Sequence, residues 1–204
     1  MPTLNPSAAT PLLLLMGVVA SVAVHQLFLW FGRWRETLHP WVVTWCATSL
    51  VVLAGHYLQA VAETADGAGL GARLAWISSL ALITVMIGLS HALAGRVLPR
   101  PLLAGLVGTN LVLLALAAFG EGVVTGTVYL RTDRLGTRYW TLEPGPLLTA
   151  LVPCFLVIFA YCAVTVWRSR ALTRGERRAV LGGFAVYFAF AVNDVLHAAR
   201  VIQS

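Results

Sequence analysis

The chain has 204 residues, of which 59% are hydrophobic and 11% are charged, whereas soluble domains contain about 45–50% apolar and about 25% charged residues. This apolar excess, with a mean hydropathy of +0.82, excludes an ordinary soluble domain and predicts an integral membrane protein embedded in the lipid bilayer. The net charge of +6 comes from arginines between apolar stretches. Because such arginines set topology in membrane proteins, no nucleic-acid partner is expected.

Six segments each offer the roughly 20 mostly apolar residues that a helix needs to cross a bilayer. A spanning segment must satisfy its own backbone hydrogen bonds, which favours helices. The sequence therefore predicts an all-α, polytopic transmembrane helix bundle. Because no internal repeat or linker divides it, residues 1–204 form a single domain. The predicted spans are Thr10–Phe31, Trp41–Ala62, Leu74–Ala94, Pro101–Phe119, Pro146–Trp167 and Ala179–Ile202.

The connection between the fourth and fifth spans contains two β-prone runs, "TVYL" and "RYWT", on either side of the turn-rich "RTDRLGT". This pattern predicts a short β-hairpin, with an irregular surface loop as the alternative. Such a hairpin would lie outside the cell and cap the outer mouth of the bundle.

Arginines indicate the orientation, because cytoplasmic loops carry an excess of basic residues. If the N-terminus lies outside, more of the arginines fall on the cytoplasmic side than on the outer side. The cytoplasmic group is Arg33, Arg35, Arg96, Arg100, Arg168, Arg170, Arg174, Arg177 and Arg178, and the outer group is Arg73, Arg131, Arg134, Arg138 and Arg200. The bias predicts a multi-pass membrane protein with its N-terminus outside.

Ionisable residues within spans are costly and usually face the bundle interior, so they are candidates for a functional site. Near the outer surface, His56 and Glu63 share one face of the second helix, and Asn193 and His197 share a face of the sixth. If these faces meet, they enclose a polar pocket. The predicted ligand-binding residues are His56, Glu63, Trp76, Asn193, Asp194 and His197. The alternative is that they only form hydrogen bonds between helices, and Asn110 in the fourth span has the same two interpretations.

The histidines also allow a different class of function. His25 and His91 on the cytoplasmic side, with His56 and His197 on the outer side, could hold one or two b-type haems through paired axial ligands and carry electrons. His56, Glu63, Asp194 and His197 could instead bind a divalent transition metal. Neither set has a specific spacing, so no cofactor is the leading expectation.

The chain contains no phosphate-binding glycine loop, no HExxH motif and no GxSxG motif. These are the short motifs that would indicate common enzymatic chemistry. The sequence therefore gives no reason to expect an enzyme.

The order of features resembles the N-terminal multi-span sensor module, of the seven-transmembrane type, of bacterial sensor histidine kinases and membrane diguanylate cyclases. The similar stretches are "GRWRETLHPWVVTWCATSLVVLAGHYLQA", "ARLAWISSLALITVMIGLSHALAGR", the external segment that ends in "EPGPLL", and "AVLGGFAVYFAFAVNDVLHAARVI". The resemblance covers nearly the whole chain, and "ND" (Asn193 and Asp194) is its most specific feature. It implies a sensory, signal-transducing receptor of the bacterial inner membrane, and the polar pocket predicted above would bind its ligand, a small molecule or ion.

In that family a seventh helix leads to a cytoplasmic output domain, whereas this chain stops at "ARVIQS". We therefore expect a fragment, a stand-alone relative, or a module that acts through a partner. The expected partners are an unknown small ligand, a second copy in a homodimer, and a cytoplasmic signalling protein. Without the output domain, the kinase or cyclase activity of the family is not expected here.

Overall fold

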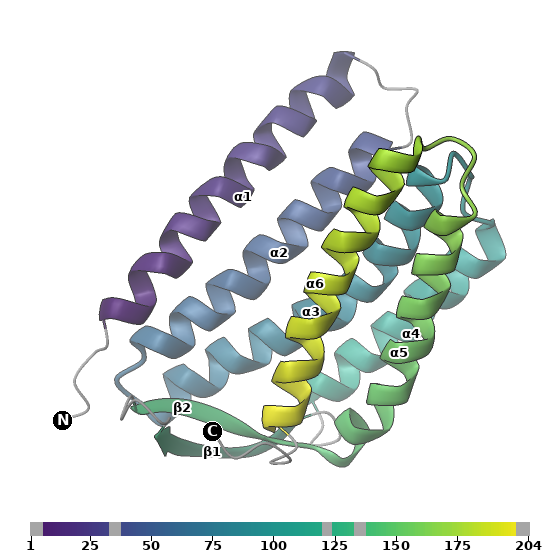
Figure 1. The fold of residues 1–204 in the computed structure, drawn as a ribbon. Helices are drawn as coiled ribbons and strands as arrows, with labels where there is room; N and C mark the ends of the chain where they lie inside the picture. Colours follow the sequence, from purple (N-terminus) through teal and green to yellow (C-terminus); the bar gives the residue numbers. More distant parts are fainter. Residues whose placement is uncertain (1–5, 33–37, 120–123, 133–137, 199–204) are drawn as a thin grey trace.

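The computed structural model describes residues 6–32, 38–119, 124–132 and 138–198. Its elements are α1 (Pro6–Gly32), α2 (Leu38–Val61), α3 (Ala65–Leu93), α4 (Arg100–Phe119), β1 (Val124–Thr132), β2 (Arg138–Pro144), α5 (Pro146–Trp167) and α6 (Arg174–Ala198). Successive helices run in opposite directions, and the two strands lie across one end of the bundle (Figure 1). The helical bundle is confirmed, and a hairpin joins α4 to α5.

Three of the described helices are long and apolar enough to cross a membrane: Thr10–Gly32, Leu38–Val61 and Ala65–Leu93. Two shorter apolar helices, Arg100–Leu116 and Pro153–Trp167, lie within α4 and α5. These helices support association with a lipid bilayer, because a span needs about 20 apolar residues. Crossing by all six helices stays a prediction.

The third helix begins at Ala65, whereas the sequence pattern placed its start at Leu74. Thr64 caps the helix, since its hydroxyl accepts a hydrogen bond from the Gly67 N–H at 3.2 Å. Asp66 in the first turn complements the positive end of the helix dipole. The glycines of this stretch would weaken an isolated helix, but here Gly69 packs against Val128 of β1 and Gly71 packs against the backbone of α2.

Helices α2 and α3 approach until their backbones touch. A Cβ added to Gly55 would lie 2.6 Å from both the Ala75 nitrogen and the Gly71 oxygen, and one added to Gly71 would lie 2.7 Å from the Gln59 nitrogen. Small residues are the usual means by which membrane helices pack this closely. Gly88 serves the same purpose further along α3, where the Trp41 ring of α2 fills the space that a side chain would need.

The core lies around α3, which packs against α2, α4, α5 and the hairpin. Its larger part joins α3 to α5 and α6 through Met86, Ile87, Leu98, Cys162, Val166 and Phe184. A smaller cluster centres on Leu80 and contains Leu113 of α4 and Phe155 of α5. Between these helices, the Asn110 amide donates a hydrogen bond to the Thr84 hydroxyl. This bond agrees with the helix–helix interpretation of Asn110.

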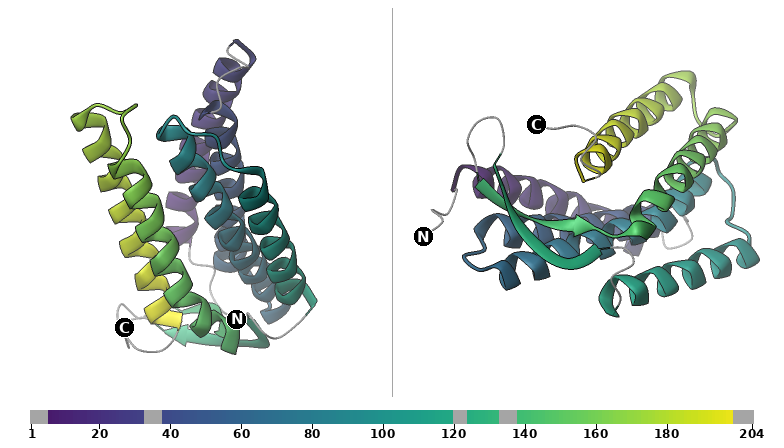
Figure 2. Two further views of the ribbon diagram at one scale, coloured as in Figure 1. Left: turned by 90° about the vertical axis from the view of Figure 1, so that its right-hand side faces the viewer. Right: turned by 90° about the horizontal axis from the view of Figure 1, so that it is seen from below.

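Strands β1 and β2 pair in antiparallel fashion, with Leu130 opposite Trp140 and Val128 opposite Leu142. Both predicted runs, "TVYL" and "RYWT", lie within these strands. The connecting turn lies outside the described residues. Seen from below, the hairpin lies across the ends of α2 and α3 (Figure 2), in agreement with its contacts to both helices.

The sixth helix begins at Arg174, earlier than the predicted start at Ala179. The sequence "TRGE" forms a capping box, in which the Thr173 hydroxyl accepts from the Glu176 N–H at 3.3 Å. In return, the Glu176 carboxylate accepts from the Thr173 N–H at 2.8 Å. These reciprocal bonds satisfy two backbone donors that would otherwise lack partners, so the helix extends into the polar loop.

Candidate functional site

The hairpin is attached to the ends of α2 and α3 by specific contacts. The Gln59 side-chain amide of α2 donates a hydrogen bond to the Trp140 carbonyl of β2. On α3, a Cβ at Gly69 would lie 3.2 Å from the Val128 side chain of β1, so the strand packs directly on the helix backbone. The hairpin is therefore a fixed cover over this end of the bundle.

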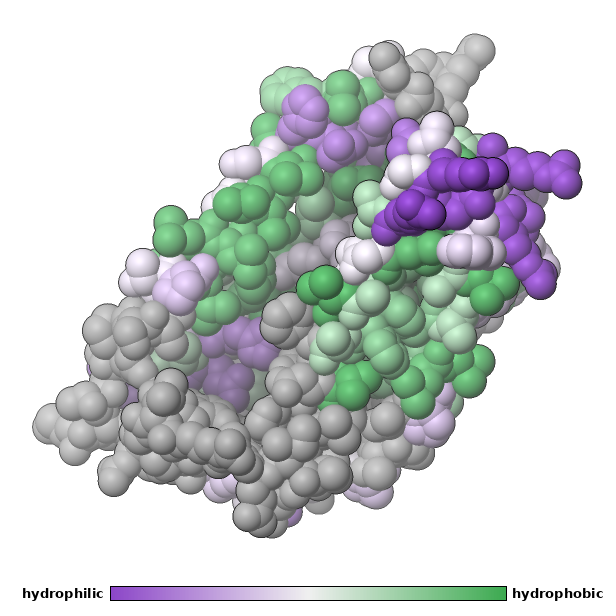
Figure 3. Space-filling model, viewed as in Figure 1, coloured by the Kyte–Doolittle hydropathy of each residue, from purple (hydrophilic) through white to green (hydrophobic). Residues whose placement is uncertain are grey.

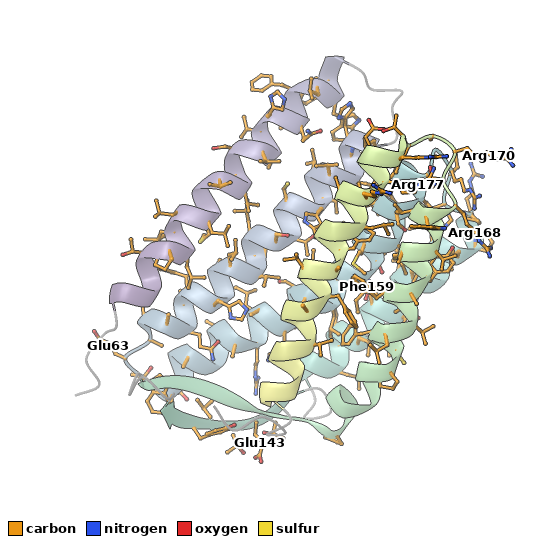
Figure 4. All side chains as sticks on the ribbon, viewed as in Figure 1. Glu63, Glu143, Phe159, Arg168, Arg170 and Arg177 are labelled. Atoms are coloured by element: carbon orange, nitrogen blue, oxygen red, sulfur yellow. The ribbon has the colours of Figure 1, made fainter. Side chains whose placement is uncertain are left out.

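His56, one of the predicted ligand-binding residues, is exposed on α2, close to this cover. Glu63 is exposed too, but α2 ends at Val61, so Glu63 lies in the bend before α3 and the prediction that it shares a helix face with His56 is wrong. Trp76 is half-buried on α3, one turn beyond Ala72, which is buried. Glu63 lies at the hairpin end of the bundle together with Glu143 of β2 (Figure 4). The structure thus places His56, Glu63 and Trp76 in the half of the bundle that the hairpin covers.

The α6 members of the predicted site are Asn193, Asp194 and His197, which lie in the last part of the helix, at the same end of the bundle (Figure 1). Their side chains lie outside the described residues. Helix α6 packs mainly against α5, whereas α2 packs against α1 and α3. A hollow separates α2 from α6 on this face, and hydrophilic side chains show in it near the hairpin (Figure 3). That the α6 residues meet His56 and Glu63 across this hollow stays a prediction.

Two residues of this region were missed by the sequence analysis. Gln59 lies on α2 between His56 and Glu63 and holds the hairpin; its polar side chain in an apolar span was the signal. Trp140 is half-buried, and its indole Nε1 is buried with no hydrogen-bond partner in the described part of the chain. Buried polar groups normally have partners, so this N–H is a donor that the described part of the chain leaves unsatisfied.

The haem hypothesis requires His25 to lie opposite His91. His25 is exposed on α1 and lines a shallow hollow with Ala20, Ser21, Val24 and Phe28. His91 is buried between α3 and α5, and its Nε2 is 2.7 Å from the Tyr161 hydroxyl oxygen. The structure does not bring this pair together. The outer pair, His56 and His197, stays untested, because the side chain of His197 lies outside the described residues.

The described residues contain no group of three His, Cys, Asp or Glu side chains that could hold a metal ion. The predicted metal set includes Asp194 and His197, whose side chains are not among those residues. The transition-metal hypothesis is therefore a prediction that the geometry leaves open.

His91 belongs to a polar group inside the opposite half of the bundle. Ser90 beside it is fully buried and donates to the Ile87 carbonyl at 2.8 Å. The His91 Nδ1 atom is buried and has no partner within the described ranges. Hydrogen bonds of this kind hold membrane helices together, and the His91–Tyr161 bond fixes α3 against α5.

Charge divides the two ends of the molecule. Arg168, Arg170 and Arg177 lie at the end opposite Glu63 and Glu143 (Figure 4). At that end, the Thr173 hydroxyl and the Thr173 N–H both donate to Glu176, and these bonds hold the pKa of its carboxyl below the usual range. Glu176 is thus charged at neutral pH and is occupied by its own helix cap.

No protein-family model matches the chain, and comparisons with curated proteins and with solved structures found no match. The resemblance to sensor modules accordingly rests on the sequence pattern alone.

Proposed function

We propose that the protein is a sensory module of the bacterial inner membrane that binds a small molecule or ion at the hairpin end of its bundle. In this proposal all six helices cross the membrane and the N-terminus and hairpin lie outside. The arginine-rich end then faces the cytoplasm, as the positive-inside rule requires. The ligand would enter the hollow between α2 and α6.

The observation that carries the proposal is the attachment of the hairpin to α2 through Gln59 and Trp140. The attachment point lies one turn from His56, and Glu63 follows in the bend after α2. The hairpin brings the unpartnered indole N–H of Trp140 to the same end. An N–H donor, an imidazole and a carboxylate at one end of the bundle are the kinds of polar group that fix a ligand in a small-molecule site.

Ligand binding at the hairpin end could change the structure of the opposite end of the molecule through α6. A ligand that contacts both α2 and α6 favours one relative position of the two helices, and it can shift their equilibrium only by its differential affinity for the two positions. Helix α6 continues into the arginine-rich loop between residues 168 and 173. A small sliding movement of α6 along α5 would therefore change that loop on the cytoplasmic side.

Thermal unfolding of the detergent-purified chain tests the proposal. The probes are four classes of compound, namely dicarboxylates, amino acids, polyamines and divalent cations. A binder present at about 100 times its Kd stabilises the folded state by about 2.7 kcal/mol, which raises Tm measurably. We expect at least one class to raise Tm, and His56→Ala and Glu63→Gln to abolish that rise.

The matched control is His25→Ala, which removes an exposed histidine from α1, far from the hairpin contacts. It should leave the ligand-induced rise unchanged. The proposal fails if no class raises Tm, or if the rise survives in both His56→Ala and Glu63→Gln.

A further inference from the structure

The arginine-rich end is formed by two loops that pack against each other. Gly95, in the turn between α3 and α4, has a φ of +67°, a conformation that favours glycine. A Cβ at this position would lie 3.2 Å from the Ala171 Cβ in the loop between α5 and α6. The two loops, which come from different helix pairs, therefore form one continuous surface.

Internal hydrogen bonds hold the α5–α6 loop in shape. Ser169 is 2% exposed, and its hydroxyl accepts from the Ala171 N–H at 3.1 Å. Arg177 folds back from α6, and its Nη2 donates to the Ser169 carbonyl at 2.7 Å and to the Leu172 carbonyl at 3.2 Å. Arg177 thus serves the loop itself, which leaves the other arginines of this end for external contacts.

The remaining described arginines of this end are all exposed: Arg96, Arg100, Arg168, Arg170, Arg174 and Arg178. In the space-filling view, strongly hydrophilic side chains gather at this end, over the start of α6 and the end of α5 (Figure 3). Glu176 is the one acidic residue among the described residues of this end, and its carboxylate is bonded to Thr173. The surface is therefore positively charged, and few acidic side chains among the described residues neutralise that charge.

Large apolar side chains are exposed next to these arginines. Trp167 is 63% exposed at the end of α5, and Val97 is 80% exposed in the α3–α4 turn. Tryptophan is enriched where a membrane protein meets the headgroup layer. The combination of exposed apolar and cationic side chains indicates a surface that meets acyl chains and phosphate groups together.

We propose that this surface binds the phosphate groups of anionic phospholipids, through Arg168, Arg170 and Arg174 of the α5–α6 loop and Arg96 of the facing turn. Guanidinium groups bind phosphate with paired hydrogen bonds. Basic residues next to spans attract anionic headgroups in this way. The inference is independent of the proposed sensor pocket, which lies at the other end of the bundle.

The test uses the full chain in neutral detergent and measures Tm against added short-chain phosphatidylglycerol, with phosphatidylcholine of the same chain length as the reference lipid. Phosphatidylglycerol should raise Tm more than phosphatidylcholine does. The triple variant Arg168→Gln, Arg170→Gln, Arg174→Gln should weaken the apparent phosphatidylglycerol affinity by about tenfold or more. Sodium chloride at about 0.5 M should weaken it in the wild type, because salt screens exposed charges.

Arg73→Gln is the control, since Arg73 lies on α3 at the hairpin end; it should keep the wild-type affinity. Native mass spectrometry of retained lipid gives a second readout, and the single variant Arg170→Gln replaces the triple variant if the latter fails to fold. Equal protection by both lipids, or unchanged affinity in the triple variant, would overturn the proposal. Equal protection by inorganic phosphate would do the same, because it would show a site for free anions.

Discussion

Helices α1 and α3 have nearly the same apolar character but opposite positions in the fold. Their most apolar 18-residue stretches have mean hydropathies of 2.2 and 1.8, yet none of the α1 stretch is buried, whereas 56% of the α3 stretch is. Hydropathy predicts that both helices enter the membrane, because lipid and protein interior are equally apolar. It does not predict which helix other helices surround.

The difference lies in side-chain size. Small residues recur every fourth position on α3, at Gly67, Gly71, Ala75 and Ser79. Two of them, Gly71 and Ala75, let the α2 backbone approach until it touches that of α3 at Gly55. On α1, a side chain at Gly17 would meet nothing within 4 Å. A small residue thus lies at a helix–helix contact on α3, whereas on α1 a small residue faces no neighbouring helix in the described part of the chain.

The largest effect should come from filling the α2–α3 contact. Gly71→Leu would force a side chain against the Gly55 oxygen, which lies 2.7 Å from the Cβ position. Because the obstacle is backbone, we expect a loss of about 3 kcal/mol or more, at or beyond the upper end of overpacking costs. Gly17→Leu on α1 should leave stability unchanged or slightly raised, since leucine favours helix. The measurement is thermal unfolding of both variants in detergent. Equal Tm values would contradict the conclusion that α3 is packed and α1 is not.

Removal of a leucine should give the next largest effect. Leu80 on α3 is 1% exposed, so Leu80→Ala leaves a cavity and should cost about 2–3 kcal/mol, toward the lower end of the usual range. Leu14 on α1 is 68% exposed, and Leu14→Ala should change stability by less than about 0.5 kcal/mol. The measurement is the midpoint of unfolding in a denaturing detergent. A similar cost at both positions would mean that α1 is covered in the folded protein.

A hydrogen bond between helices should matter more than one within a helix. Tyr161→Phe removes the partner of the His91 Nε2 atom and should cost about 1 kcal/mol, as is usual for polar contacts between membrane helices. Ser21→Ala on α1 removes only the bond of 2.9 Å to the Gly17 carbonyl of the same helix. It should be close to neutral in the same unfolding assay. The interpretation of His91 as a structural residue fails if Tyr161→Phe is neutral too.

The smallest effect on stability should come from Glu176, which is exposed in the first turn of α6 and belongs to neither α1 nor α3. Its folded-state pKa is lowered by the bonds from Thr173, so its contribution is present above the unfolded pKa of about 4.3 and is lost as pH falls through the folded pKa. The Tm difference between wild type and Glu176→Gln should therefore shrink between about pH 6 and pH 3. A difference that stays constant over this range would contradict the role of the charged carboxylate.

Much of the fold could be predicted from local patterns. The six helices follow from apolar segments, and the hairpin follows from "TVYL" and "RYWT" around a turn. The start of α3 was misplaced, because the glycines in "GAGLGA" weaken a helix by propensity. The contacts of Gly69 with β1 and of Gly71 with α2 come from the tertiary structure. The start of α6 was also placed too late, although the sequence "TRGE" has the pattern of a capping box.

Only part of the candidate site could be predicted. His56 and Glu63 were proposed because ionisable groups stand out in an apolar sequence, and their role in binding stays a prediction. The roles of Gln59 and Trp140 were not identified, since the bond between them joins residues 81 positions apart in the chain. The partner of His91, Tyr161, is 70 positions away.

By itself, the sequence determined which segments are apolar enough to leave water, where helices alternate with polar loops, and on which ends the arginines gather. These properties depend on composition and on spacing along a few helical turns. Only the tertiary structure decided that α3 is central and α1 peripheral, that the hairpin is fastened to α2, and that His91 points inward while His25 points outward. Each of these depends on which side chains leave room for a distant neighbour, and no local pattern contains that information.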